Sequence, residues 1–198
     1  MDATIREQRR LETDLRRALE TGSLQLAYQP VISFHDESLV GFEALLRWPE
    51  GWEPQSPAAF IPVAEESGLI NAIGAWVLKT ACRTAANWSK SLKLTVNISS
   101  VQFRRGDIVS VVEEALKSSG LDPARLELEV TESLWIQDTD IVLDQLGRLR
   151  KLGISLVLDD FVTGYSSLTN LWKFPFDTVK IDNRLYGGWI SRKKQLLS

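Results

Sequence analysis

Polar side chains that can hold metals or move protons interrupt apolar, strand-like stretches of this 198-residue chain. They are densest in LVLDDFVTGYSS, where an apolar run leads into the adjacent carboxylates Asp159 and Asp160 and then into a turn-forming loop. A buried strand that ends in paired acids is a common way to hold a divalent metal beside a substrate. An isolated acid pair is also compatible with a solvated strand end, so the other strands must decide between the two interpretations.

Other strand-like segments also carry polar residues, mostly toward their carboxyl ends, where β/α folds build their sites. The residues with this placement are Gln29, Glu43, Arg47, Asn97, Glu129, Glu132, Asp159, Asp160 and Lys180. Converging acids need cations, because burying an unpaired carboxylate is costly. Oxygen ligands favour Mg²⁺ or Mn²⁺, and a pair of such ions about 3.5–4 Å apart suits in-line attack on phosphorus. We predict one ion held by Glu43, Asn97, Glu129 and Asp159, with Asp160 reaching a second.

Purely structural interpretations of the same residues stay open. Gln29 is compatible with an edge-strand position, Glu43 and Arg47 with a buried ion pair, and Lys180 with a solvated strand end. Glu127 is expected on the surface, alternating away from Glu129. Taken as an assembled set, the polar residues favour the metal site over these separate accounts.

Composition limits the partners and the chemistry. A net charge of −3 and a pI near 5.3 give no electrostatic case for a nucleic-acid polymer. The single cysteine, Cys82, excludes an internal disulfide, and its neighbours at helical spacing predict a packed small hydrophobe. The single histidine, His35, lies in a polar loop, which leaves little for a His-based site. No apolar stretch approaches the roughly 20 residues that span a bilayer, so the cytoplasm is the expected location.

The elements that must position these residues alternate between strands and helices. Strands are predicted over residues 24–32, 39–48, 92–99, 125–132, 154–160 and 177–182. Helices are predicted over residues 1–21, 57–66, about 70–88, 107–119 and 142–152, with a short one through Leu168 and Leu171. This alternation indicates a buried parallel sheet, either an open doubly wound sheet or a β/α barrel. The chain has no G-x-G-x-x-G pattern, which speaks against a dinucleotide fold.

Several motifs occur in order along the chain: FEALLRW, VNISS, LELEVTES, DDFVTGYSSL and TVKID, together with YQP and AAFIPVAEESGLI. In this order they resemble the EAL-domain family of cyclic di-GMP phosphodiesterases. The resemblance covers about residues 11–182. It implies a connector helix over residues 1–20, an EAL-type domain over residues 21–182 and a divergent tail over residues 183–198.

The resemblance implies a TIM-type barrel with an antiparallel first strand, which hydrolyses cyclic di-GMP to linear pGpG with Mg²⁺ or Mn²⁺. It implies metal ligands at the positions predicted above and assigns Lys180 to the attacking water and the phosphoryl charge. It further implies that Gln29 and Arg47 contact the substrate and that Glu132 orders the loop after Asp160. An upstream GGDEF or sensor domain and a homodimer are expected on the same basis.

Two departures from the family pattern bear on activity. Val162 replaces the glycine of DDFGTGYSS, which threatens the loop beside Asp160 and with it the second metal. After Asp182 the motif-level likeness stops, so an incomplete barrel that lacks the last two strands is expected. Weak or absent hydrolysis then becomes one expectation, and a non-catalytic module that binds cyclic di-GMP or a protein becomes an alternative. A fragment without a stable fold is a third.

Overall fold

A six-stranded sheet carries the predicted site. The computed structural model describes residues 2–33, 35–53, 55–89, 91–131, 134, 139–161 and 174–181. The strands are β1 (Gln25–Ile32), β2 (Leu39–Arg47), β3 (Lys93–Asn97), β4 (Leu126–Thr131), β5 (Ser155–Phe161) and β6 (Thr178–Ile181). They lie in sequence order, with β1 antiparallel to β2 and each later pair parallel. This order fits an EAL-type barrel rather than a doubly wound sheet, whose strand order reverses at a switch point.

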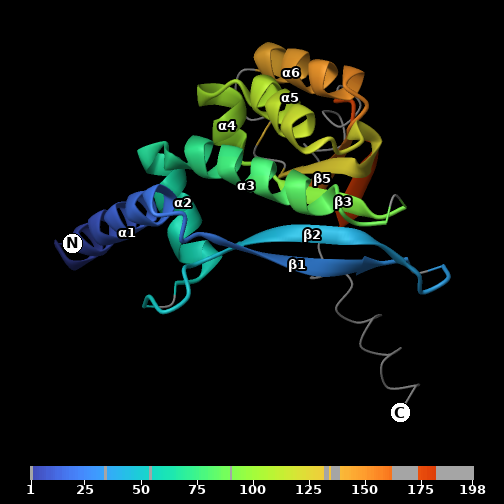
Figure 1. Cartoon of the computed structure of the whole chain (residues 1–198). Helices are drawn as coiled ribbons and strands as arrows, with labels where there is room; N and C mark the ends of the chain where they lie inside the picture. Colours follow the sequence, from blue (N-terminus) through green and yellow to red (C-terminus); the bar gives the residue numbers. More distant parts are fainter. Residues whose placement is uncertain are drawn as a thin grey trace.

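Helices cover one face of the sheet, and all the described ones except α1, which precedes the first strand, lie between the parallel strands in the sequence (Figure 1). They are α1 (Asp2–Glu20), α2 (Pro57–Ser67), α3 (Leu69–Ala85), α4 (Ser100–Arg105), α5 (Ile108–Ser119) and α6 (Thr139–Lys151), with a short 3₁₀ turn, η1 (Pro123–Arg125). The covered face is built from alternate strand residues such as Leu94, Leu128 and Leu158, all fully buried. Because side chains alternate along a strand, the residues between them point to the opposite face.

Strand register brings the predicted polar residues to that opposite face. Gln29 pairs with Glu43 across β1 and β2, and Asn97 pairs with Glu129 across β3 and β4. Asp159 in β5 pairs with Thr131, two residues beyond Glu129 on the same face of β4. The sheet therefore gathers residues that lie far apart in the sequence.

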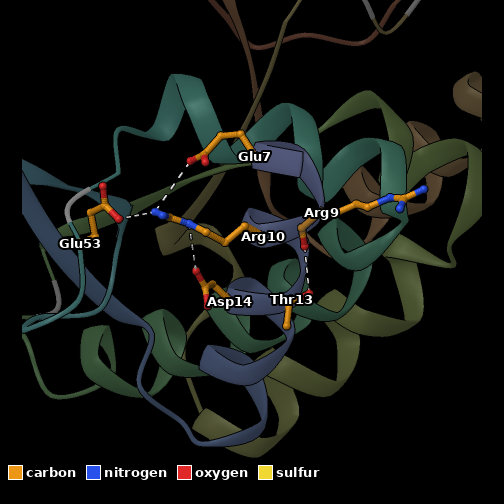
Figure 2. Close-up of polar contacts among 6 residues, drawn as sticks. All are labelled: Glu7, Arg9, Arg10, Thr13, Asp14 and Glu53. Atoms are coloured by element: carbon orange, nitrogen blue, oxygen red, sulfur yellow. Dashed lines mark hydrogen bonds and ion pairs between the residues drawn. The ribbon is translucent and has the colours of Figure 1, made fainter. Parts of the chain in front are cut away.

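The second half of α1 packs against the core of the domain. Leu11, Leu15 and Ala18 are buried in the core. On the exposed side, the Arg10 guanidinium donates a hydrogen bond to Glu53 in the β2–α2 loop and lies near Glu7 and Asp14 (Figure 2). A connector role for residues 1–20 stays a prediction.

Capping residues explain several helix ends. Gly68 and Gly120 end α2 and α5 with φ of 78° and 70°, in the left-handed region that favours glycine. Asp107 begins α5 as predicted, because its carboxylate accepts a hydrogen bond from the Ser110 amide at 3.1 Å. The helix predicted over about residues 70–88 is too long at its carboxyl end, because α3 ends at Ala85.

Some predictions lie outside the described residues: Glu132, Val162, the short helix through Leu168 and Leu171, and the tail after residue 181. Within the described part of the chain, the longest helices are too short or too polar to cross a bilayer.

Candidate functional site

Four side chains from four different strands meet at the carboxyl end of the sheet. The Asn97 amide Nδ2 donates a hydrogen bond of 2.7 Å to Glu43 Oε1. The Lys180 ammonium lies 3.9 Å from Glu43 Oε2 and forms a close ion pair with Glu129 Oε1. Glu43 therefore contacts Asn97 and Lys180, and the ion pair with Arg47 that the sequence left open is not formed among the described residues.

Glu129 is the most deeply buried acid of this group, with 1% of its side chain exposed. Its Oε2 atom has no hydrogen-bond partner among the described residues. Burial raises the pKa of the Glu129 carboxyl to about 7, against the opposing effect of Lys180, while Glu43 and Asp159 add to the rise. A buried, half-partnered carboxylate is costly to fold, and such groups concentrate at functional sites.

Lys180 supplies the cation that these carboxylates need. Its partial burial lowers the pKa of the ammonium, but the hydrogen bond and the charge of Glu129 outweigh that effect and the net pKa is raised. The side chain is 38% exposed, so the ammonium lies between the buried carboxylate and solvent. Lys180 is thus a charged member of the cluster rather than the solvated strand end left open by the sequence.

Asp159 lies on the same face in β5, close enough for its charge to act on both Glu129 and Lys180. Asp160 follows it within β5, and its side chain lies outside the described residues. The structure thus brings Asp159 to the cluster and leaves the role of Asp160 a prediction.

A pocket of about 310 Å³ adjoins the cluster and is lined by Arg47, Asn97 and Glu129. Part of its lining is apolar and comes from α2 and α3, through Ile61, Ile70, Ile73 and Val77. Arg47 is exposed at the end of β2. Gln29 is also exposed and faces Glu43 across β1 and β2, outside the pocket lining.

Comparison with known proteins identifies the family. A family model described as the EAL domain matches residues 12–197. The chain belongs to the EAL-domain family. The match extends beyond Asp182, where the motifs recognised in the sequence end.

The relatives of this chain in the EAL-domain family are much longer proteins, which contain the matching region as one part. The chain is 49% identical over 185 residues to an uncharacterized signaling protein of Caulobacter vibrioides, covering 92% of this chain and 23% of the relative. It is 42% identical over 190 residues to the bifunctional diguanylate cyclase/cyclic di-GMP phosphodiesterase MucR of Pseudomonas aeruginosa, covering 92% and 27%. The chain thus spans about a quarter of the length of the curated relatives it matches.

Solved structures confirm the EAL fold. The PaMucR phosphodiesterase in a c-di-GMP complex matches with a TM-score of 0.83 at 39% identity, covering 94% of this chain and 78% of that one. The FimX EAL domain of Xanthomonas citri in complex with c-diGMP matches with a TM-score of 0.82 at 27% identity, covering 95% and 75%.

The donor chemistry of this EAL domain fits a hard divalent ion. Within the described residues, no three His, Cys, Asp or Glu side chains form a metal-holding group by themselves. The predicted set contains three such acids, Glu43, Glu129 and Asp159, and in the structure these three do not form that group. The Lys180 ammonium contacts Glu43 and Glu129 instead. Since the Asn97 nitrogen is engaged with Glu43, its oxygen is available as a ligand atom, and Glu129 Oε2 has no hydrogen-bond partner in the part of the chain that the structure describes.

Other pocket residues of the EAL domain escaped the sequence analysis. Glu65, Ser99 and Gln102 line the pocket, and α4 was not predicted at all. The available signal was the spacing of Ser99 and Gln102, which is a capping-box pattern.

One surface assignment was wrong. Glu127 lies two residues before Glu129, so both point to the same face of β4. Its side chain is only 20% exposed, pairs with Lys93 at 2.6 Å and accepts a hydrogen bond from Thr95. By contrast, the prediction of a packed Cys82 is confirmed: its thiol is buried, and burial raises its pKa to about 12.

Proposed function

We propose that this chain hydrolyses cyclic di-GMP to linear pGpG in a reaction that depends on Mg²⁺ or Mn²⁺. The observation that carries the proposal is the buried Glu129 carboxylate, whose Oε2 lacks a hydrogen-bond partner among the described residues. A fold rarely keeps such a group unless a ligand completes it. Membership of the EAL family, whose relative MucR is named a cyclic di-GMP phosphodiesterase, supports the choice of substrate.

Glu43, Asn97, Glu129 and Asp159 would hold the first ion, and Asp160 would serve a second. Bound there, a divalent ion supplies an activated water and offsets charge on the phosphoryl group. The residues themselves set the geometry: the hydrogen bond from Asn97 to Glu43 joins β3 to β2 and orients both side chains before a ligand arrives. Lys180 is assigned to hold the attacking water and to stabilise charge developing on the phosphoryl oxygens.

Arg47 and the adjoining pocket suit the rest of the substrate. An exposed guanidinium at the pocket edge can bind a phosphate through two parallel hydrogen bonds. The apolar wall from α2 and α3 offers a guanine base a surface to pack on. Gln29, which faces Glu43 across the sheet, is assigned to substrate contact, and Glu132 to ordering the loop after Asp160.

Turnover and metal dependence can be tested together. The purified chain is incubated with cyclic di-GMP and either MgCl₂ or MnCl₂, and pGpG is quantified by ion-exchange chromatography. We expect product that disappears with EDTA and in Asp159→Asn. Absence of product, or equal product from Asp159→Asn, would overturn the assignment of this site.

A non-catalytic role in binding cyclic di-GMP is the second candidate. It is favoured by the ion pair of Lys180 with Glu129, which offsets the buried charge without a metal. Calorimetry with cyclic di-GMP, with and without EDTA, separates the candidates: binding without turnover supports this one. A cooperative thermal transition would exclude a fragment without a stable fold. The homodimer, the upstream GGDEF or sensor domain and the cytoplasmic location stay predictions.

A further inference from the structure

The turn that follows β3 ties the end of that strand to three other elements. The Ile98 amide donates a hydrogen bond of 2.8 Å to the carbonyl of Glu129 in β4. Ser99 then begins α4 as its N-cap. The turn immediately after Asn97 is therefore fixed to the strand that carries Glu129.

A capping box holds Ser99 through two of its groups, the side-chain hydroxyl and the backbone amide. The Ser99 Oγ accepts a hydrogen bond from the Val101 amide at 3.1 Å. The Gln102 Oε1 atom accepts one from the Ser99 amide at 3.0 Å. These two bonds leave the hydroxyl proton of Ser99 for a third partner.

That partner is Glu65, which lies 34 residues earlier in α2. Ser99 Oγ donates to Glu65 Oε1 at 2.6 Å, the length of a charge-assisted bond. Glu65 is half-buried and lines the same pocket as Asn97. A carboxylate on a helix thus holds the turn that immediately follows a predicted metal ligand.

The glycine of α3 shows that the chain makes room for this arrangement. A Cβ added at Gly74 would lie 2.1 Å from Gln102 Nε2. A glycine inside a helix is less favourable than an alanine, because it loses more conformational freedom on folding. The absence of a side chain at Gly74 lowers the stability of the helix but leaves the space that Gln102 occupies when it caps Ser99.

We propose that Glu65 is a positioning residue, which holds Asn97 in its ligand geometry through the hydroxyl of Ser99. This inference rests on the proposed metal role of Asn97. Glu65 acts at a distance: it fixes the turn, the turn fixes the end of β3, and the Asn97 amide is thereby directed at Glu43. Partners of this kind typically change metal affinity by about 10–100-fold when removed.

The direct test is the side-chain amide signal of Asn97, assigned by its loss in Asn97→Asp. In metal-free wild type, we expect an Nδ2 proton protected from solvent exchange by its bond to Glu43. In Glu65→Leu and in Ser99→Ala, we expect this protection to be lost, because the turn no longer holds Asn97 against Glu43. Glu65→Gln keeps an acceptor for Ser99 and should retain protection, as should Glu66→Leu, a change at the exposed neighbouring acid.

Mn²⁺ affinity, measured by calorimetry, gives the second readout. Glu65→Leu and Ser99→Ala should each raise Kd about tenfold, and the double variant should be no weaker than either single one. A role confined to stability would lower Tm and leave both readouts unchanged, and that result overturns the proposal. Should Glu65→Leu not fold, Ser99→Ala breaks the same bond from the other side.

The amide signal needs neither metal nor substrate, so the two proposals fail separately. A chain that hydrolyses nothing, yet loses Asn97 protection in Glu65→Leu, contradicts the phosphodiesterase function and supports Glu65. An active chain whose Asn97 signal is unchanged in Glu65→Leu contradicts the role of Glu65 alone.

Discussion

One charged side chain is buried just before β4 and another within it, and the fold treats them in opposite ways. At the amino end, Arg125, the last residue of η1 before β4 begins, is 8% exposed, and its guanidinium donates to the carbonyls of Leu92 and Ala85 at 2.8 and 2.9 Å. At the carboxyl end, Glu129 is 1% exposed and keeps one oxygen without a partner among the described residues. A buried charge that the fold satisfies is structural, whereas one that it leaves incomplete marks a site for a ligand.

The largest expected effect is on activity, at the carboxyl end. Glu129→Gln should lower kcat for cyclic di-GMP hydrolysis by roughly a hundredfold or more, because the variant loses an anionic metal ligand. Its free energy of unfolding in metal-free buffer should change by less than about 1 kcal/mol, since a neutral amide is easier to bury and the freed Lys180 reaches solvent. Steady-state kinetics and urea denaturation measure the two quantities.

Glu127→Gln is the matched control, because it makes the same change on the same face of the same strand. Its kcat should stay within about threefold of wild type, since its partners are Lys93 and Thr95 rather than the cluster. Equal losses in the two variants would show that any acid on this face matters and would remove the contrast between the ends of β4.

The next largest effect is on stability, at the amino end. Arg125→Met keeps an unbranched apolar stem but removes the guanidinium, so the Leu92 carbonyl loses this donor while the Ala85 carbonyl still accepts from the Trp88 amide at 3.0 Å. We expect the free energy of unfolding to fall by about 1–3 kcal/mol, the cost of one unpaired buried carbonyl. Activity per folded molecule should not change. Arg104→Met, at an exposed arginine, serves as the control, and a loss of turnover in folded Arg125→Met would contradict the division proposed for β4.

The two buried charges also differ in how far the sequence predicts them. The placement of Glu43, Asn97 and Glu129 was accessible from the sequence, because each interrupts an apolar strand and strand periodicity fixes its face. The antiparallel pairing of β1 was expected only through the family resemblance, since periodicity does not set strand direction.

The rest depends on contacts between distant segments. Arg125 gave no sequence signal, because its partners are backbone carbonyls of any residue type. The bond between Glu65 and Ser99 joins residues 34 positions apart, and no local pattern encodes it. The misplacement of Glu127 was different: the two-residue period of the strand was available and was misapplied.

The buried thiol of Cys82 tests whether burial alone marks a functional group. Cys82 is fully buried like Glu129, and burial alone raises its pKa from 9.0 to about 12. The folded thiol keeps its proton while the unfolded one loses it above about pH 9, so the free energy of unfolding should fall as the pH rises through that range. Urea denaturation of wild type and Cys82→Ala between pH 8 and 11 isolates this component. Cys82→Ala should leave kcat unchanged, and a loss of turnover would show that Cys82 also serves the reaction, so that burial and function would not be separate here.

The smallest effect is expected where charges are exposed. The Arg10 guanidinium binds Glu53 across the gap between α1 and the β2–α2 loop, with 44% and 68% of these side chains exposed. Exposed ion pairs contribute little, because water solvates both partners and salt screens them. Arg10→Ala should therefore leave the midpoint of urea denaturation unchanged within error, in low and in high salt. Arg17→Ala, which removes the guanidinium 5.1 Å above the Trp52 ring, is the sharper comparison on the same helix. A clear loss of stability in Arg10→Ala alone would mean that this pair anchors α1, and exposure would then no longer separate this weak pair from the buried charges of Arg125 and Glu129.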